Sequence, residues 1–229
     1  MSYFWIFVYI LFVIFVLTLF FWSTFILLQQ KKVWEKFAKK HDLVFRKAGF
    51  FESGAVEGNY KKHRIGLFSE GRRDEATRGM IKYRTVIEVV FDFGMPAFGA
   101  LGNENSLHII DALNFGTPHH PDYKGWNKRH LITCSNRKFI VDYLTPKRMD
   151  KLNGFFNMKN VIAMMIFDKE DAFLRVEMGD PMTDPKKIEQ LLDKLIVLGQ
   201  DLKLTKEEEK KWVQASDQAP LEEEEASST

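Results

Sequence analysis

The sequence predicts an α+β protein: an N-terminal transmembrane helix followed by one cytoplasmic domain, which has antiparallel sheets and helices packed on one face. Three observations lead to this prediction. Residues 3–28 contain no charged residue, proline or glycine. Apolar residues alternate along residues 82–93, as they do in a strand. Strands come in groups with helices between them, an order typical of α+β proteins rather than of a doubly wound parallel sheet.

The apolar run is long enough to cross a membrane. The hydrocarbon core of a bilayer is about 30 Å thick and needs about 20 apolar residues in a helix. A signal peptide has a shorter apolar stretch, of roughly 7–15 residues, and a small-residue cleavage site, but no A-x-A pattern follows this run. An interfacial helix needs a charged face, and residues 3–28 have none. We therefore expect residues 1–30 to anchor the chain, with residues 3–28 in contact with membrane lipid.

The charged residues that flank the run predict its orientation. No Lys or Arg precedes it, and five lysines follow it closely. Basic residues beside a span stay on the cytoplasmic side, so we expect the N-terminus outside the cell (inner) membrane and residues 31–229 in the cytoplasm. A single cysteine, Cys134, fits a reducing compartment. The five lysines are Lys31, Lys32, Lys36, Lys39 and Lys40.

Charge is unevenly distributed along the chain. The formal net charge is +2, but residues 206–229 hold 3 basic and 8 acidic residues, which leaves 30 basic and 23 acidic in residues 31–205. A basic domain beside an anionic leaflet gains roughly 1 kcal/mol for each Lys or Arg that reaches the surface. Nucleic acid would satisfy the same charge. Because the domain is tethered, we prefer anionic lipid headgroups to nucleic acid as its partner.

The domain begins with a helix and a hairpin. Residues 31–41 are predicted as a short amphipathic helix, because Trp34 and Phe37 recur at helical spacing among lysines. These two rings either reach the lipid headgroups or pack on the domain. Val56–Tyr60 and Ile65–Phe68 flank a polar tetrad, which predicts a hairpin.

The middle of the chain is predicted to contain few regular elements. The charged residues 70–79 indicate an exposed connection, and residues 82–93 form the clearest strand of the sequence. Residues 94–128 are rich in Gly, Pro and Asn and are predicted as a long irregular segment whose apolar cluster is Leu107–Leu113. A short strand is expected at His130–Cys134.

Two helices follow. Asn136–Tyr143 has apolar residues at helical spacing. Thr145 and Pro146 then begin a second helix, because Thr suits the cap and Pro suits the first helical position.

The last part of the domain is predicted as a hairpin and a long helix. Residues 160–167 are almost wholly apolar, as in a central strand that is covered on both faces, and residues 172–178 return as its partner. Asp184 is predicted to cap a helix that reaches Leu202. The folded domain thus covers residues 31–205. Residues 206–229 are acidic and poor in large apolar residues, which predicts a flexible tail.

A partial resemblance covers about half of the chain. Trp126–Val176 contains a short strand, a helix, the step Leu144-Thr145-Pro146, a second helix and a hairpin around Asp168. This order resembles a module of uncharacterised bacterial membrane-anchored proteins, and Trp34–Leu67 is similar to the start of their domain in layout. The resemblance implies a structural module. That family has no assigned activity, so the resemblance implies no functional residues.

One loop contains candidate metal ligands. Imidazole and carboxylate groups bind metals in general, and residues 108–122 hold several of them at intervals that are irregular for a metal site. The loop is therefore predicted either as a plain polar segment or as a metal site, and the latter would support a membrane-tethered metal-dependent hydrolase. The candidate ligands are His108, His119, His120 and Asp122.

Other signs of catalysis are weak. His130 and Cys134 would lie on one face of a strand but about 13 Å apart, too far for a hydrogen bond, so we expect a buried or neutral cysteine. Phosphate-binding patterns of the G-x-x-x-x-G-K-[ST] and G-x-G-x-x-G types are absent, as are G-x-S-x-G and H-E-x-x-H. The sequence therefore predicts no catalytic residue and no cofactor.

Three arginines form the best basic patch beyond the five lysines. Arg72, Arg73 and Arg78 suit a lipid surface or an acidic protein partner, and a solvated loop is the alternative. With the apolar run and the basic flank, they favour a non-enzymatic binding or scaffold role at the membrane surface, as an accessory subunit or adaptor. The hydrolase described above is the competing hypothesis.

Overall fold

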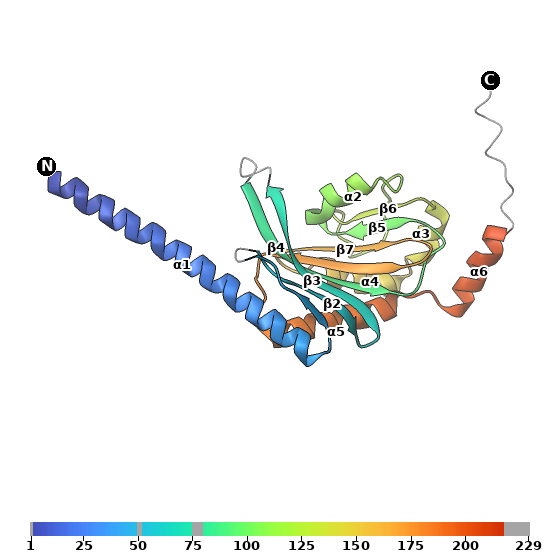
Figure 1. The fold of residues 1–229 in the computed structure, drawn as a ribbon. Helices are drawn as coiled ribbons and strands as arrows, with labels where there is room; N and C mark the ends of the chain where they lie inside the picture. The colour runs from blue at the N-terminus through green and yellow to red at the C-terminus, as the bar shows by residue number, and fades with distance from the viewer. Residues whose placement is uncertain (1, 50–51, 75–79, 218–229) are drawn as a thin grey trace, which may run out of the picture. The chain divides into compact units, whose positions relative to one another are not determined.

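The structure, a computed structural model, describes residues 2–49, 52–74 and 80–217. The predicted α+β class, with a long apolar N-terminal helix and an antiparallel sheet, is confirmed (Figure 1). The strands of the described residues are hydrogen-bonded in the order β1-β2-β3-β4-β8-β7-β5-β6. The elements are α1 (Ser2–Lys40), β1 (Val44–Arg46), β2 (Ala55–Tyr60), β3 (His63–Asp74), β4 (Met80–Phe91), β5 (Gly99–Gly102), the 3-10 helix η2 (Glu104–Ser106), α2 (Leu107–Leu113), β6 (Leu131–Cys134), α3 (Arg137–Tyr143), α4 (Pro146–Phe156), β7 (Val161–Phe167), β8 (Ala172–Met178), α5 (Pro185–Leu202) and α6 (Lys206–Asp217).

The chain divides into two compact units, and the single domain expected between residues 31 and 205 stays a prediction. The first unit contains Met1–Val89 and Arg175–Leu195, and the second contains Val90–Leu174 and Ile196–Thr229. The division passes through β4, β8 and α5, so each unit takes part of these three elements. Local sequence patterns do not report such a division, because it runs within elements and leaves no linker between them.

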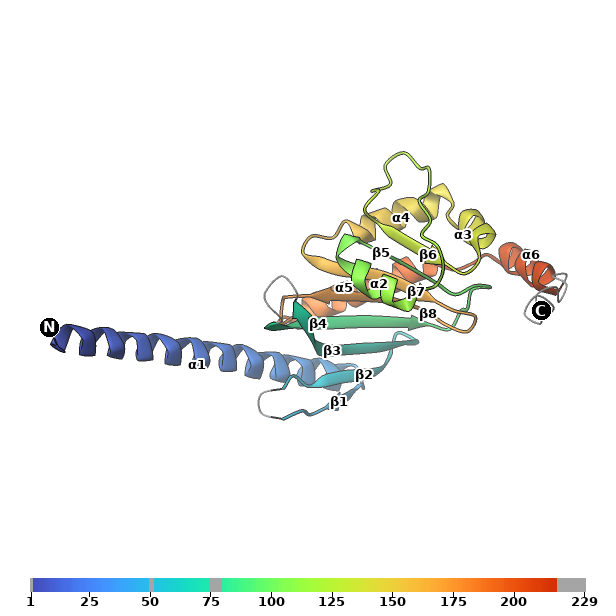
Figure 2. The same ribbon diagram turned by 90° about the horizontal axis from the view of Figure 1, so that it is seen from above.

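In the first unit, α1 runs without a break from the apolar run into the folded part (Figure 2). The apolar half is exposed, with Trp22 at 65% of its full surface. Farther along, Trp34 and Phe37 are buried at 0% and 1% exposure. The Trp34 Nε1 donates a hydrogen bond to the Met182 carbonyl at 3.2 Å. These two rings therefore pack on the domain, which decides between the alternatives that the sequence left open.

The hairpin predicted from residues 56–68 is present as β2 and β3. Val56 pairs with Leu67, and Tyr60 pairs with His63. The turn between them has positive φ at both central residues, Lys61 (49°) and Lys62 (70°), as the type I′ turn of a two-residue hairpin requires. Strand β3 continues to Asp74, so it includes much of the segment predicted as an exposed connection. The remainder of that connection, residues 75–79, lies outside the described residues.

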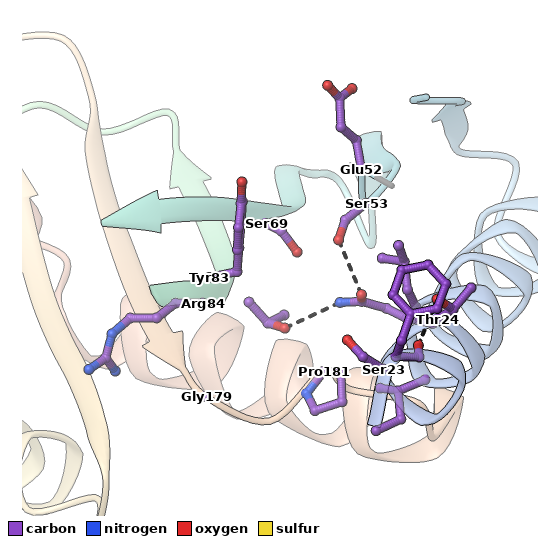
Figure 3. A pocket seen from close by; sticks show the side chains of 14 residues that line it. Ser23, Thr24, Glu52, Ser53, Ser69, Tyr83, Arg84, Gly179 and Pro181 are labelled. Atoms are coloured by element: carbon purple, nitrogen blue, oxygen red, sulfur yellow. Dashed lines mark hydrogen bonds between the residues drawn. The ribbon is translucent and has the colours of Figure 1, made fainter. Parts of the chain in front are cut away.

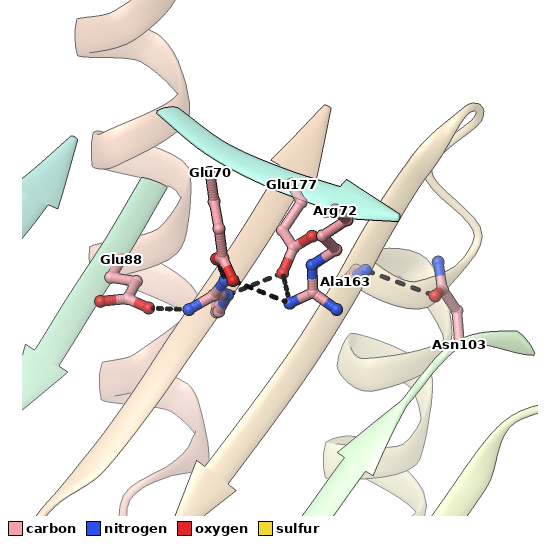
Figure 4. A network of polar contacts seen from close by, with 7 residues as sticks. Glu70, Arg72, Glu88, Asn103, Ala163 and Glu177 are labelled. Atoms are coloured by element: carbon pink, nitrogen blue, oxygen red, sulfur yellow. Dashed lines mark hydrogen bonds and ion pairs between the residues drawn. The ribbon is translucent and has the colours of Figure 1, made fainter. Parts of the chain in front are cut away.

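A charged network joins β3, β4 and β8 within the first unit (Figure 4). Arg175 donates to Glu88 at 2.6 Å and to Glu177 at 2.8 Å, and it also pairs with Glu70. Arg72 donates to Glu177 at 2.7 Å. Burial opposes the charge on Arg175, but Glu177, Glu88 and Glu70 outweigh it and raise the pKa of Arg175. Two guanidinium groups thus neutralise Glu177, whose side chain is fully buried.

The second unit contains the helix starts that the sequence predicted. The Thr145 hydroxyl accepts a hydrogen bond from the Arg148 backbone N–H at 3.4 Å, and α4 begins at Pro146. Strand β7 is almost wholly buried and lies between β8 and β5 in the sheet order, as its apolar sequence predicted.

The predicted cap of the long helix lies in the first unit. Asp184 accepts a hydrogen bond from the Lys186 N–H at 2.9 Å and caps α5.

Strand β5 corrects the prediction of a wholly irregular segment at residues 94–128. It pairs with both β6 and β7 and is completely buried. A Cβ atom at Gly99 would collide with the Phe167 ring, and one at Gly102 would collide with the Ser106 hydroxyl. The strand therefore consists of small residues because its neighbours approach closely. Such a contact leaves no pattern of alternating large side chains in the sequence.

Helices cover both faces of the sheet in the second unit, whereas the sequence predicted helices on one face. Ile110 of α2 packs with Ala100 and Leu131. The adjacent residue of β5 is Gly99, which pairs with Phe167. Because successive residues of a strand alternate between faces, the Phe167 side chain lies on the face opposite to Ile110. There Phe167 meets Phe139 of α3, with ring centroids 6.2 Å apart. Both faces of the sheet are apolar along these strands, so a helix packs on each face.

Helix α6 occupies much of the segment that composition predicted as a flexible tail. Trp212 is buried, and its ring lies edge-on to Phe139 at 5.3 Å. Arg148 donates two hydrogen bonds to the Glu208 carboxylate, at 2.8 and 2.7 Å, and lowers the pKa of Glu208 to about 2. One aromatic residue and two ion pairs, Arg148 with Glu208 and Lys211 with Asp142 at 2.8 Å, therefore hold a helix of polar composition. Residues 218–229 of the predicted tail lie outside the described residues.

Candidate functional site

A cleft of about 620 Å³ lies within the first unit, where the apolar half of α1 meets the folded part. All of its lining residues belong to that unit. Helix α1 forms one wall with Phe20, Ser23 and Leu27, and β3 and β4 contribute Ser69 and Tyr83. The volume is within the range of roughly 300–1,000 Å³ that is typical of small-molecule sites.

Gln30 provides a fixed polar group at the cleft. Its side chain is buried at 5% exposure. The Nε2 donates to the Thr85 hydroxyl at 3.5 Å, and the Oε1 accepts from the Ser53 hydroxyl at 3.2 Å. Because Gln30 is held from two sides, the orientation of its amide is set, and Nε2 keeps a second hydrogen beyond the bond to Thr85.

Uncharged groups dominate the interior of the cleft. In Figure 3, the hydroxyls of Ser53 and Ser69 point into the cleft, whereas the Glu52 carboxylate and the Arg84 guanidinium point away from it. The Thr24 hydroxyl is already bonded to the Phe20 carbonyl of its own helix at 2.9 Å. The cleft thus offers hydroxyl and amide hydrogen bonds beside an apolar wall. That chemistry suits binding of a neutral polar group that is attached to an apolar one.

The five predicted lysines lie on the second half of α1. They divide into three that are bonded to other residues and two that are exposed. Lys40 pairs with Glu189 at 2.6 Å, and Lys39 pairs with Glu35 at 2.9 Å. The Lys31 Nζ donates to the Gly49 carbonyl at 2.5 Å. The two remaining residues, Lys32 and Lys36, are exposed and have no ion pair within the described part of the chain.

The predicted arginine patch is placed only in part. The Arg72 side chain is 20% exposed and bonded to Glu177. Arg73 lies in β3, but its side chain is outside what the structure describes, as is the whole of Arg78. The surface role of the patch stays a prediction, and Arg72 contributes to the charged network.

The histidine loop is spread over several segments. His108 lies exposed on α2, and the His119 N–H donates to the Ile132 carbonyl at 2.8 Å, which ties that residue to the edge of β6. Burial, Arg137 and His120 lower the pKa of His119. His120 and Asp122 are exposed. Among the described residues, no three His, Cys, Asp or Glu side chains gather in a way that could hold a metal.

Cys134 and His130 occupy buried positions in the second unit. Burial raises the pKa of the Cys134 thiol, which donates to the Asn136 carbonyl at 3.4 Å. Burial also lowers the pKa of His130, whose ring packs edge-on against Trp126 and Phe156 at 5.3 Å each. The prediction that the cysteine is buried is confirmed.

Comparisons with protein-family models, with curated proteins and with solved structures found no match. The resemblance of Trp126–Val176 to membrane-anchored bacterial proteins therefore stays a prediction.

Sequence reasoning missed the cleft, because its lining comes from segments far apart in the chain. One signal was present. Ser23 and Gln30 are seven residues apart on α1 and so share one helix face, beside the end of the apolar run. A polar stripe on an otherwise apolar helix indicates the face that meets polar neighbours.

Proposed function

We propose that the chain is a single-pass membrane protein, with its N-terminus outside, whose cytoplasmic domain serves a non-enzymatic binding or scaffold role at the membrane surface. The observation that carries this proposal is the division of α1. Its first half is long and apolar enough to cross a membrane, and it is not buried by the rest of the described chain. Its second half is buried in the first unit.

A continuous helix fixes the distance between the membrane and the domain. Flexible linkers let a domain move away from its anchor, but Gln30, Trp34 and Phe37 are buried directly after the apolar run. The first unit therefore lies against the lipid headgroups. An accessory subunit or adaptor needs such an arrangement, because it must present its surface at a set height.

Lys32 and Lys36 support contact with anionic lipid. They are four residues apart on α1, so they share a face. Trp34, midway between them, points into the first unit, so the two lysines face away from it. Each contributes roughly 1 kcal/mol where it reaches an anionic leaflet.

The cleft supports a binding role, because it offers hydroxyl and amide groups beside an apolar wall. An unidentified membrane or cytoplasmic protein partner is compatible with this role. The metal-dependent hydrolase built on His108, His119, His120 and Asp122 stays the alternative prediction.

The test is extraction and protease protection of the full chain. We expect it to stay in the pellet after alkaline carbonate treatment, and residues 31–229 to survive external protease in sealed cells but not in permeabilised ones. N-terminal sequencing of the purified chain is expected to find residues 3–28 still attached. Release into the supernatant, loss of the run by cleavage, or digestion in sealed cells would each refute the proposal.

A further inference from the structure

We propose that the cleft holds the glycerol-ester region of one phospholipid from the adjoining leaflet, with the acyl chains along the apolar half of α1. This inference rests on the proposed function, because it requires that half of α1 to lie in lipid. It goes further by naming the ligand class of the cleft.

The position of the cleft suits a lipid. Phe20, Ser23 and Leu27 belong to the last turns of the apolar run, and Gln30 follows directly. In a spanning helix these turns lie at the boundary between hydrocarbon and headgroups. The ester groups of a phospholipid lie at the same depth, so a lipid reaches the cleft without leaving the bilayer.

The hydrogen-bonding groups of the cleft complement those of an ester. Ester and phosphate oxygens only accept hydrogen bonds, so a binding site must supply donors. Ser23 and Ser69 bring hydroxyls from α1 and β3. The second Nε2 hydrogen of Gln30 adds a donor from a side chain that is more than nine-tenths buried and held by Thr85 and Ser53.

Charge distinguishes the ester region from the phosphate. The charged groups that line the cleft, on Glu52 and Arg84, point away from its interior (Figure 3). A neutral, donor-rich interior suits ester carbonyls, whereas a phosphate buried there would lack a cation. The phosphate therefore lies outside the cleft, in water at the membrane surface.

The experiment is native mass spectrometry of the full chain released from detergent micelles, with zwitterionic phospholipid added in a defined ratio. We expect the wild type to retain one phospholipid. Ser69→Phe places a ring in the cleft and should lower the retained fraction at least tenfold. Asn59→Phe is the matched control, because Asn59 is an exposed residue of the neighbouring strand β2 outside the cleft. It should retain lipid like the wild type.

A milder variant keeps the test informative if Ser69→Phe does not fold. Ser69→Ala removes one hydroxyl that points into the cleft, and loss of one hydrogen bond should lower retention about fivefold. Equal retention in the wild type and both variants, or a bound mass that is a polypeptide, would overturn the inference. Failure of the chain to stay in the carbonate pellet refutes the proposed function instead, so the two failures are distinguishable.

Discussion

Trp22 and Trp34 lie twelve residues apart on one helix, yet their surroundings are opposite. Trp22 exposes 65% of its surface, and Trp34 exposes none. Most large side chains in the first half of α1, such as Phe12 and Leu17, are exposed like Trp22. Burying one such side chain contributes roughly 1.5–3 kcal/mol. The buried half of α1 obtains this contribution from the core of the first unit, and the exposed half would obtain it from lipid if it spans a membrane as proposed.

The difference teaches that one helix is built for two environments. No change in secondary structure marks the border, because backbone hydrogen bonds are satisfied within a helix in either environment. Only the side chains change, near Gln30, where the helix acquires polar partners from Ser53 and Thr85.

The largest expected effect comes from placing charge in the exposed half. The double variant Val16→Lys with Leu17→Lys should disfavour membrane insertion by about 5–7 kcal/mol, because each lysine at a span centre costs about 2.5–3.5 kcal/mol. The fraction of the chain that resists carbonate extraction should fall. The double control Asn59→Lys with Gln200→Lys changes two exposed residues of the folded part and should leave that fraction unchanged. Equal resistance in both variants would break the comparison.

The two tryptophans test the comparison directly. Trp34→Ala should lower the free energy of unfolding by about 3–5 kcal/mol, because it leaves a cavity in the core and an unpaired Met182 carbonyl. Trp22→Ala should change it by less than about 0.5 kcal/mol, as an exposed substitution does. Denaturant unfolding in detergent, followed by circular dichroism, measures both. Similar losses would mean that the second half of α1 is not held by the core.

Helix α6 sharpens the comparison, because a charge pair replaces much of the apolar packing there. Arg148→Met removes the bonds to Glu208 and those to the Tyr143 and Lys203 carbonyls. The attachment of α6 should weaken by about 2–3 kcal/mol, a typical value for bonds to charged groups. Faster hydrogen exchange of the α6 amides measures this. Lys147→Met, at an exposed neighbouring position, is the control and should leave those exchange rates unchanged.

The exposed Lys32 and Lys36, which follow the apolar run, should affect the orientation of the chain in the membrane. Lys32→Glu with Lys36→Glu removes about 1 kcal/mol of attraction per lysine to an anionic leaflet and adds repulsion. A larger share of chains should then expose residues 31–229 to external protease. Lys206→Glu with Lys210→Glu is the matched control, because these residues have the same spacing on α6 and are also exposed. If both pairs of substitutions have the same effect, orientation does not depend on Lys32 and Lys36.

Acid should gradually weaken the attachment of α6 to the rest of the second unit, and this effect should be smaller than the preceding ones. Arg148 holds the pKa of Glu208 at about 2, below its ordinary value of 4.5. A carboxyl whose pKa is lowered by folding contributes stability above pH 4.5 and loses it as the pH falls through about 2. A fluorine label on Trp212 should report this release by NMR. In Glu208→Gln, which cannot ionise, the same titration should show no transition in that window.

The elements that sequence predicted well are those with local signals. The caps at Thr145 and Asp184 depend on contacts two or three residues away, and the β2–β3 hairpin depends on a short turn. Their physical causes therefore lie within a few residues of the sequence. The same is true of the apolar run, whose length and composition are read directly.

The features that sequence missed depend on distant residues. Gly99 is required in β5 because the Phe167 ring lies against it, and α6 is held because Arg148 reaches Glu208 across 60 positions. The cleft likewise combines Ser23 with Ser69 and Tyr83. Chemistry at those positions is visible in the sequence, but their proximity is created by folding, so neither the site nor the attachment of α6 followed from local patterns.

The single thiol of the chain, at Cys134, is shielded at the end of β6. A modifying reagent therefore reacts only when that part of the second unit opens, and the reaction rate acts as a clock for opening. The first unit contains no cysteine, so the reaction reports from the second unit alone. The single thiol therefore offers a way to time the opening of one unit in the full chain.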